Sequence, residues 1–483
     1  MVNERFFYAG EWQDPLATES FDVHDPASGE RIGKIPLAGH EDIDRAVQAA
    51  RQAVPVWASM HADERARIIH KAADLIVTRI DEIAELLTRE QGKPVSGSRK
   101  EIEFGIEVLR YYAQEGRCVY GSLRPSMSTG IKSIVSYQPL GVVAAIVPWN
   151  YPVDIYCWKI GAALAAGCPI VVKPPHETPF AIGKVVECFE EAGLPPGVLA
   201  NLPGTGPVAG AALAKHPGVD AISATASVAA GQDIMRNAAG NLKRLSLELG
   251  GHSPFIVLPD ADIEEAASAA MRRSFSNMGQ ICIAVNRILV HQAVHKRFIE
   301  ALTELTTAIE LGHGMEPGVE YGPALNQSVI ERTQRHIKDA LAKGGKLITG
   351  GDHAQLAGLE KGFFFRPTLI DKAPLNSLPM TEETYGPLAA IHSCDCEKTL
   401  LDNANSLPYG LAAYVFSRDL ERAWDIADQL EFGAVGVNIN DTTELQAPFG
   451  GWKLSGIGSE LGPEGLHAFL QPKHVKVRVR RRV

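Results

Sequence analysis

The chain has 483 residues, of which 45% are hydrophobic and 22% are charged, and its formal net charge is −10. A single hydrophobic core rarely extends past about 250–300 residues, so this length predicts at least two structural domains. The acidic balance argues against nucleic acid or an anionic membrane surface as the main partner, because both favour a basic face.

The chain shows no predicted targeting or membrane segment. Its first seven residues lack the apolar stretch of a signal peptide. The most apolar region, 141–172, is interrupted by Asn150, Asp154 and Lys159, which argues against a membrane span. The seven cysteines are odd in number and irregularly spaced. We therefore expect reduced thiols, a cytoplasmic location and no metal site.

The predicted elements follow each other in α/β order. Residues 41–90 have helical spacing and end at Gly92-Lys93-Pro94. Short β-branched runs at 142–147, 169–172, 219–222 and 254–258 then alternate with helical segments, and a further α/β region spans 287–437. Valines alternate with basic residues in the tail, 473–482, which predicts a strand with one dry face. The pattern indicates parallel sheets, whose ligands bind at the carboxyl ends of the strands.

Two motifs at strand ends carry candidate chemistry. Pro148-Trp149-Asn150-Tyr151-Pro152 follows the first apolar strand, and an asparagine amide there could stabilise an oxyanion. The alternative is a loop whose asparagine only caps backbone. In Leu247-Glu248-Leu249-Gly250-Gly251 a carboxylate lies within an apolar strand, where burial would raise its pKa and make it a usable base. The alternative is an outward-facing glutamate on an edge strand.

A third motif supplies a candidate nucleophile. In Phe275-Ser276-Asn277-Met278-Gly279-Gln280-Ile281-Cys282 a cysteine ends a polar loop beside backbone N–H groups, which can favour a reactive thiolate. A buried structural cysteine is the alternative. Each motif is weak alone, but together they offer a nucleophile, a base and an oxyanion donor.

These motifs closely resemble those of the aldehyde dehydrogenase superfamily, and the resemblance covers essentially the whole chain. It continues in 173–179, 382–387, 448–451 and 455–456. The resemblance implies that Cys282 is the nucleophile and that Asn150, with the Cys282 backbone N–H, stabilises the oxyanion. It implies that Glu248 activates the water that hydrolyses the thioester, and that Lys159 and Glu460 support this carboxylate and its proton path.

The resemblance also implies a site for NAD or NADP, formed by Trp149, Lys173, His176, Ser227, Gly231, Glu383 and Tyr385. Lys173 would reach the adenosine ribose or its phosphate, and Glu383 the nicotinamide ribose. His176 stands where NAD-preferring members often have a glutamate that repels a 2′-phosphate, so we expect NADP to be accepted at least as well as NAD. Glu177 is the alternative ribose partner. Ala226 replaces a glycine of the phosphate loop, which predicts altered cofactor affinity.

The predicted substrate tunnel is mainly apolar and aromatic, formed by Tyr151, Asp154, Trp158, Ile281, Ile283 and Phe449. Hydrophobic pockets discriminate weakly, so we expect broad specificity for aliphatic or aromatic aldehydes. Trp158 and Ser276 stand where members specific for succinic semialdehyde carry arginines, so we expect succinic semialdehyde to be a poor substrate. Asp154 would favour a cationic aminoaldehyde if it faced the tunnel. A place in solvent or at a helix start is commoner for aspartate.

By the same resemblance, the α/β fold combines a Rossmann-like cofactor domain (1–118 and 139–250), a catalytic domain (251–450) and an oligomerisation arm (119–138 and 468–483). An exposed strand edge in the arm needs a partner, which predicts a homodimer or homotetramer. Two rival functions are acyl transfer to coenzyme A, disfavoured by Glu248, and a catalytically silent scaffold, disfavoured by the intact trio Asn150, Glu248 and Cys282.

Overall fold

A large mixed sheet forms the first half of the molecule in the computed structural model, which describes residues 5–479. Its strand order is β2 (Glu11–Gln13), β1 (Phe6–Tyr8), β9 (Leu199–Asn201), β8 (Ile170–Lys173), β7 (Val143–Ile146), β10 (Ala221–Thr225), β11 (Arg244–Glu248) and β21 (Gly456–Ile457). The five strands from β9 to β11 are parallel, as the alternating strand and helix pattern predicts. Such strands are buried on both faces, which explains their continuous apolar runs.

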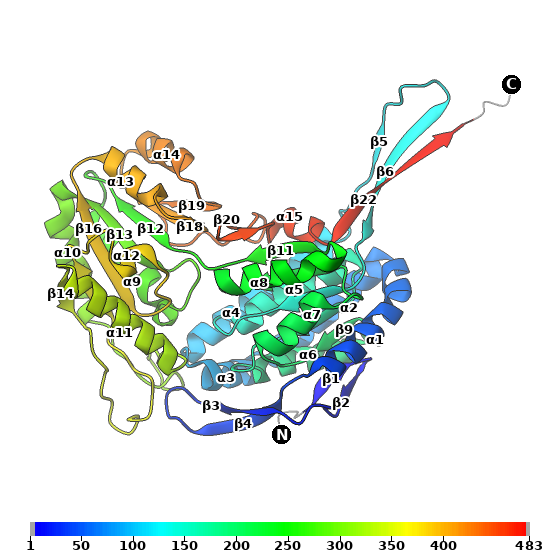
Figure 1. The fold of residues 1–483 in the computed structure, drawn as a ribbon, viewed down its shortest axis with the longest axis horizontal. Coiled ribbons are helices and arrows are strands. Elements are labelled where there is room, and N and C mark those ends of the chain that lie inside the picture. The colour runs from blue at the N-terminus through cyan, green and yellow to red at the C-terminus, as the bar shows by residue number, and fades with distance from the viewer. Residues whose placement is uncertain (1–4, 480–483) are drawn as a thin grey trace.

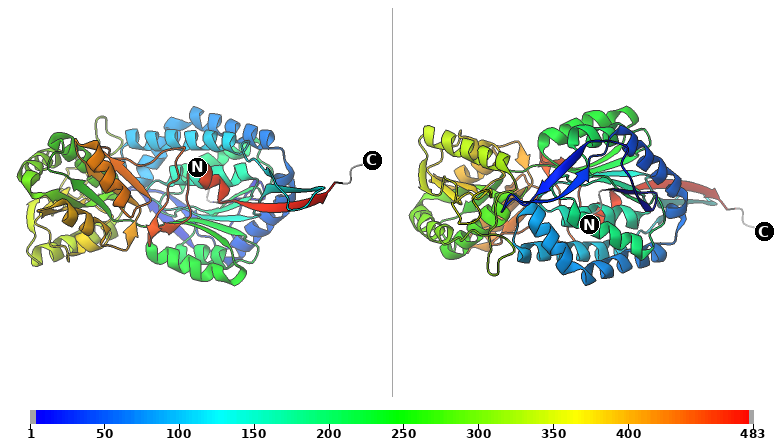
Figure 2. Two further views of the ribbon diagram at one scale, coloured as in Figure 1. Left: turned by 90° about the horizontal axis from the view of Figure 1, so that it is seen from above. Right: turned by 90° about the horizontal axis from the view of Figure 1, so that it is seen from below.

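Helices cover both faces of this sheet (Figure 2). Val143 and Ala145 of β7 face one layer, and Val142 and Ala144 face the other, because successive strand residues point to opposite sides. The first layer contains α2 (Ala62–Thr78), α3 (Ile80–Gln91), α4 (Val95–Glu115), α5 (Pro152–Ala166), α6 (Phe180–Ala192) and α15 (Gly462–His467). The second contains α1 (His40–Ser59), α7 (Ala211–Lys215) and α8 (Val228–Ala238).

A second sheet lies at the other end of the molecule (Figure 1). Its order is β14 (Lys346–Thr349), β15 (Thr368–Asp371), β16 (Leu388–Cys394), β13 (Val285–His291), β12 (Ser253–Val257), β18 (Ala412–Phe416) and β19 (Ala434–Val437). One face is covered by α9 (Ile263–Phe275) and α10 (Gln292–Thr307). The other is covered by α11 (Gln327–Ala342), α12 (Leu378–Thr381), α13 (Glu397–Asn405) and α14 (Leu420–Gln429).

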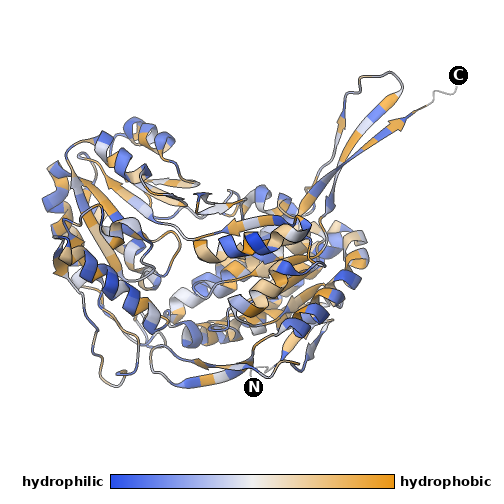
Figure 3. Cartoon of the chain, in the orientation of Figure 1, coloured by the Kyte–Doolittle hydropathy of each residue, from blue (hydrophilic) through white to orange (hydrophobic). Residues whose placement is uncertain are grey.

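The two sheets share one hydrophobic cluster, which runs from the helices of the first sheet through Trp158, Ile281 and Phe449 to α9 and α10. Two short two-stranded sheets complete the body. They are the hairpin of β3 (Ser20–His24) with β4 (Arg31–Pro36), and the pair of β17 (Tyr409–Gly410) with β20 (Trp452–Lys453). The apolar colouring of the strands and the polar outer helix faces in Figure 3 match this layered burial.

A three-stranded arm projects away from the body (Figure 1). It pairs β22 (Leu470–Arg478) with β6 (Ile131–Pro139), which in turn pairs with β5 (Ser122–Arg124). The predicted tail strand exists, but its predicted dry face is wrong for a single chain. Val475, Val477 and Val479 are 39–44% exposed because no layer of the described residues covers them. The last four residues of the predicted arm and the first four of the chain lie outside the described residues.

Candidate active site

A cavity of about 710 Å³ lies where the two sheets meet. Its wall contains most of the predicted catalytic and tunnel residues, namely Asn150, Tyr151, Asp154, Trp158, Glu248, Ile281, Cys282, Ile283, Phe449 and Glu460. They come from α5 and the loop that precedes it, the end of β11 and the loop after α9, with two further residues near the C-terminus. Segments up to 310 positions apart therefore converge on one space that is large enough for an aldehyde.

The candidate nucleophile Cys282 follows a tightly bent loop. Asn277 and Met278 both have left-handed backbone angles, with φ of 48° and 57°, and they turn the chain back after α9. Burial, with a smaller contribution from the nearby carboxylates of Glu248 and Glu383 and opposed by Arg273, raises the pKa of the Cys282 thiol to about 12. The isolated protein thus holds Cys282 as a thiol, and a base is needed to activate it.

Glu248, the candidate base, is the last residue of β11 and is 3% exposed. It lies between Thr225 of β10 and Gly456 of β21, so the alternative of an outward glutamate on an edge strand is wrong. Neither carboxyl oxygen has a partner at regular hydrogen-bond geometry within the described chain, although the Gly451 backbone N–H lies close enough to lower its pKa. Burial raises its pKa well above the usual value, and Glu460 adds to the shift, while Lys159 opposes it. An unpartnered carboxyl with a raised pKa suits proton transfer near neutral pH.

Lys159 and Glu460 form a buried ion pair beside this carboxyl. Lys159 Nζ lies 2.5 Å from Glu460 Oε1, and their side chains are 0% and 7% exposed. Ser223 Oγ accepts a hydrogen bond from Lys159 Nζ (3.1 Å) and donates one to the same Glu460 oxygen (3.0 Å). The other Glu460 oxygen has no partner among residues 5–479. The three side chains join α5, β10 and the C-terminal segment next to Glu248.

Asn150, in the loop between β7 and α5, is 2% exposed. Its side-chain oxygen is buried without a partner in the described part of the chain, so its alternative role as a backbone cap is not what the structure shows. The side chain lines the same cavity as Cys282 and Glu248. The amide is thus available to a group inside the cavity.

The predicted cofactor residues lie outside this cavity wall, mainly at the carboxyl ends of strands of the first sheet. Ser227 caps α8, and its Oγ accepts a hydrogen bond from Ala230 N (3.3 Å), so a helix N-terminus follows β10 directly. A Cβ at Gly231 would come within 2.4 Å of Leu249, which explains the glycine there. A helix N-terminus at a strand end suits a pyrophosphate.

The predicted ribose-binding residues lie at the end of β8. Burial lowers the pKa of Lys173 to about 8, and its Nζ lies 3.3 Å from Gly204 O. His176 stacks edge-on against Phe21, and its Nδ1 lies 3.3 Å from a Glu177 carboxyl oxygen. Burial lowers the pKa of His176, Glu177 opposes this, and Lys173 adds to it. The carboxylate of Glu177 therefore already lies beside His176 and competes for its ring.

The residues predicted to bind the nicotinamide end of the cofactor lie nearer Cys282 than those at the end of β8. Glu383 Oε1 accepts a hydrogen bond from Gly251 N (3.2 Å), and a Cβ at Gly250 would lie 2.4 Å from the same carboxyl. Burial raises the pKa of Glu383 to about 7. Trp149 and Tyr385 make an edge-to-face ring contact at 5.5 Å. The helix N-terminus and Lys173 offer hydrogen-bond donors to phosphate and ribose oxygens, and the Glu383 carboxylate offers an acceptor to ribose hydroxyls, so the residues fit NAD(P).

The tunnel itself is more polar than the sequence predicts. Trp158 packs against Phe449 (5.4 Å between ring centroids) and Phe104 (6.3 Å). Asp154 lies in the first turn of α5, as expected for a helix start, but it lines the cavity and is 8% exposed. It accepts a hydrogen bond from Trp158 Nε1 at 2.6 Å. Burial raises its pKa well above the usual value, with Glu101 adding to the shift.

Four cationic side chains in the wall were not predicted, namely Lys93, Lys100, Arg272 and Arg273. Arg273 lies in the last turn of α9, and its Nη2 lies 2.8 Å from Asp441 Oδ2. The Arg272-Arg273 pair just before Phe275 was the available sequence signal. Helical spacing alone did not reveal that both would line the cavity.

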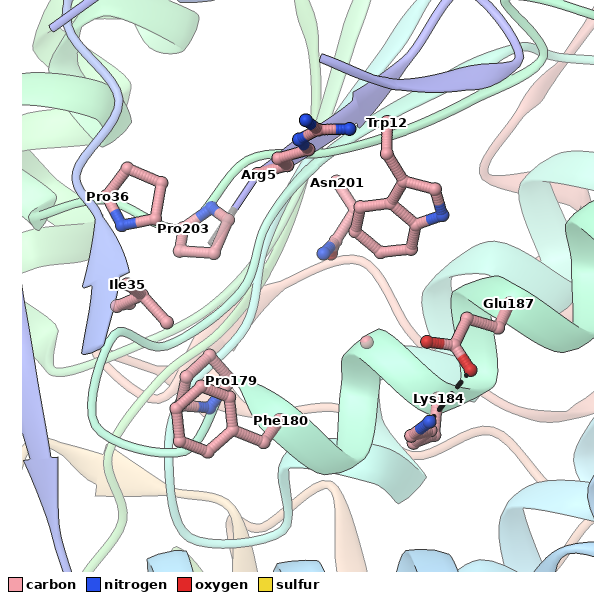
Figure 4. A pocket seen from close by; sticks show the side chains of 11 residues that line it. Arg5, Trp12, Ile35, Pro36, Pro179, Phe180, Lys184, Glu187, Asn201 and Pro203 are labelled. Carbon is pink, nitrogen blue, oxygen red and sulfur yellow. Dashed lines mark hydrogen bonds and ion pairs between the residues drawn. The ribbon is translucent and has the colours of Figure 1, made fainter. Parts of the chain in front are cut away.

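A smaller cavity of about 20 Å³ lies between α6 and the hairpins β1–β2 and β3–β4 (Figure 4). None of the predicted site residues lines it. It is large enough for about one water molecule, so it is not a site for an aldehyde or a dinucleotide. Within residues 5–479 no helix is long and apolar enough to cross a membrane, and no cluster of side chains could hold a metal ion.

Comparison with known proteins agrees with this geometry. The model of the aldehyde dehydrogenase family matches residues 12–475. A succinate semialdehyde dehydrogenase of Acinetobacter baylyi is 39% identical over 98% of this chain and 97% of its own length. An NADP-dependent succinate-semialdehyde dehydrogenase of Escherichia coli is 38% identical over 96% of both chains. An aldehyde dehydrogenase from Bacillus cereus in complex with NAD+ superposes with a TM-score of 0.95 at 36% identity, over 99% of this chain and 96% of that one.

The chain therefore belongs to the aldehyde dehydrogenase family. The predicted α/β fold, with a Rossmann-like part and a catalytic part, is confirmed by this likeness to solved aldehyde dehydrogenases. The protein is an NAD(P)-dependent aldehyde dehydrogenase.

Proposed function

We propose that this enzyme oxidises an aldehyde to a carboxylic acid with NAD or NADP, through a thioester on Cys282. The observation that carries the proposal is the convergence of Cys282, Glu248 and Asn150 on one cavity. Loss of any one of these chemical functions would leave a step without a group to perform it.

The chemistry of the chain begins at Cys282. Its thiol proton passes to Glu248, which is close enough for its charge to raise the pKa of that thiol. The sulfur then bonds to the carbonyl carbon, and the π electron pair moves to the oxygen. The Asn150 amide and the Cys282 backbone N–H donate hydrogen bonds to that oxygen. When bound, NAD(P) supplies the oxidation of the adduct to the thioester.

Glu248 also removes a proton from the water that hydrolyses the thioester, which releases the acid and restores the thiol. The raised pKa of this carboxyl makes it a better base once it is ionised. The Lys159–Glu460 pair lies alongside and would carry the proton onward from Glu248. A base in this position favours hydrolysis over transfer to coenzyme A.

We further propose that NADP is accepted at least as well as NAD. His176 presents no negative charge of its own to a 2′-phosphate, and Lys173 lies near it at the end of the same strand. Glu177, 3.3 Å from the His176 ring, is the group that would oppose this.

For the substrate, we propose a neutral aliphatic or aromatic aldehyde, because Phe104, Trp158 and Phe449 form an aromatic wall. A cationic aminoaldehyde is disfavoured because burial and the nearby Glu101 raise the pKa of Asp154, which opposes a negative charge on that carboxyl. An aldehyde with a distal acid is a second candidate. Relatives named succinate semialdehyde dehydrogenases are 38–39% identical, and Arg273 supplies a cation in the wall although Trp158 and Ser276 do not.

The reaction is tested by following reduced-cofactor formation with benzaldehyde and with a short aliphatic aldehyde, each with NAD and with NADP. Turnover that disappears in Cys282→Ala, with the free acid as product, is the expected result. Turnover that persists in Cys282→Ala, a coenzyme A ester as the product, or no turnover at all would refute the proposed reaction.

The substrate class is tested with succinic semialdehyde beside benzaldehyde in wild type and in Arg273→Leu. We expect kcat/KM to favour benzaldehyde in wild type and the variant to leave that preference unchanged. A wild-type preference for succinic semialdehyde that collapses in Arg273→Leu would establish the second candidate instead. Benzaldehyde serves as the control within each variant, because it has no anion for Arg273 to contact.

The remaining predictions concern the domain boundaries, the assembly of protomers and the cellular location. We propose that 1–118 and 139–250 form the cofactor domain, that 251–450 form the catalytic domain, and that the arm joins protomers of a cytoplasmic homodimer or homotetramer. The exposed valines of β22 support the arm's role, because a strand with apolar side chains in solvent favours pairing. Light scattering of wild type and of a chain ending at residue 469 tests it, and equal masses would refute it.

A further inference from the structure

The turn between α3 and α4 clamps the backbone of the proposed oxyanion loop. Lys93 Nζ donates a hydrogen bond to the main-chain oxygen of Asn150 at 2.7 Å. Asn277 Nδ2 donates a second one to the same oxygen at 3.1 Å. A carbonyl oxygen has two lone pairs, so both are engaged, by donors from two different segments of the chain.

The two donors are themselves connected. Gln91 Nε2 donates to Asn277 Oδ1 at 3.1 Å, and Gln91 Oε1 accepts from Lys93 N at 2.9 Å. Gln91, Lys93, Asn150 and Asn277 therefore form a closed ring of polar contacts. Because Asn277 precedes Cys282 in the same bent loop, this ring joins the loop of the oxyanion donor to the loop of the nucleophile.

Lys93 is held in place by a buried ion pair. Its ammonium pairs with Glu101 at side-chain exposures of 3% and 0%. It also lies 3.9 Å from the centre of the Tyr151 ring. The other Glu101 oxygen accepts from Val153 N (2.9 Å) and Asp154 N (3.3 Å), in the first turn of α5. Lys93 is thus fixed relative to the helix that follows Asn150.

The Asn150 side chain has no such support. Its oxygen is buried without a partner within the described residues, so the direction of its amide depends on the backbone that carries it. Oxyanion stabilisation is sensitive to donor position, because the donor must already point at the developing charge. Rotation of the Asn150 peptide would redirect the side chain within the cavity that it shares with Cys282.

We propose that Lys93, together with Asn277, is a positioning residue that orients the Asn150 amide toward the oxyanion; this inference rests on the function proposed above. Lys93 does not touch the substrate in this role. It acts through Asn150, so removal of its ammonium should lower the rate of the step that forms the oxyanion.

The test is a double-mutant cycle between the clamp and Asn150, read as the single-turnover rate of reduced-cofactor formation. Lys93→Met/Glu101→Gln removes the ammonium without leaving a lone buried charge, and glutamine can still accept from Val153 N. We expect this variant to be about 10-fold or more slower, with the aldehyde KM nearly unchanged. In an Asn150→Ala background the same change should cost less than about 3-fold, because the group being positioned is gone.

Asn277→Gly provides a second route, since glycine keeps the left-handed backbone angle and removes the amide donor to Asn150 O together with the oxygen that accepts from Gln91. It should show the same dependence on Asn150. Lys398→Met removes an ammonium that is 81% exposed and should have no effect.

Equal losses with and without Asn150 would overturn the inference, since they would mean that the clamp affects the rate independently of the oxyanion donor. An unchanged rate in both Lys93→Met/Glu101→Gln and Asn277→Gly would also overturn it. A wild-type enzyme without turnover would overturn the proposed function and this inference with it. Additive losses in an active enzyme overturn this inference alone.

Discussion

Removal of the Lys159 ammonium tests the reasoning about the buried charges beside Glu248. In Lys159→Met, Glu460 loses the partner 2.5 Å away while its side chain stays 7% exposed. Breaking a buried ion pair on one side typically costs about 3–5 kcal/mol, because the remaining charge is left uncompensated. If the chain unfolds cooperatively, with an unfolding entropy of about 2.1 cal/mol/K per residue, this loss of free energy lowers Tm by roughly 3–5 °C.

The same variant should move the pH profile. Lys159 opposes the rise in the pKa of Glu248, so its removal raises that pKa further. A base is active when it is deprotonated, and the acidic limb of kcat against pH should therefore shift to higher pH. The assay combines thermal unfolding followed by circular dichroism with steady-state rates measured between pH 5 and pH 10.

Two controls separate the buried pair from a general loss of charge. Lys398→Met breaks a pair with side chains 81% and 60% exposed, and such pairs contribute about 0–1 kcal/mol. Adding Glu460→Gln to Lys159→Met should recover part of the lost Tm, because no lone buried charge remains. A Tm loss no larger than that of Lys398→Met, or an acidic limb that moves to lower pH, would refute the reasoning.

Three further predictions follow from the site. Asn150→Ala should lower kcat about 100- to 1000-fold, the usual loss of one oxyanion donor, and stopped-flow rates less than 10-fold lower would contradict this. Because the pKa of Cys282 is about 12, its labelling by iodoacetamide should accelerate roughly tenfold per pH unit between pH 7 and 10, and a rate independent of pH would be inconsistent with a buried thiol. His176→Glu should raise the KM for NADP relative to that for NAD, and an unchanged ratio would assign the ribose contact to Glu177.

Local sequence patterns were sufficient to predict the parallel strands of the first sheet. The apolar runs at 142–147, 169–172 and 219–222 match β7, β8 and β10 within a few residues, because strands buried on both faces must be continuously apolar. Family membership also followed from local motifs, since Asn150, Glu248 and Cys282 each stand in a short and specific sequence context. The roles proposed for these three residues remain predictions that the variants above test.

The polar contacts around those residues depend on tertiary packing. Lys159 pairs with Glu460, which lies 301 positions later, and Lys93 reaches Asn150, which is 57 positions away. No periodicity connects such residues, because their proximity is set by how α4, α5 and the C-terminal segment pack together. The exposed valines of the tail are a second case in which the local sequence pattern did not predict the environment of the side chains. Alternation predicted a strand over 473–482, and the structure has one at 470–478, but only the tertiary structure decided that neither face would be buried within one chain.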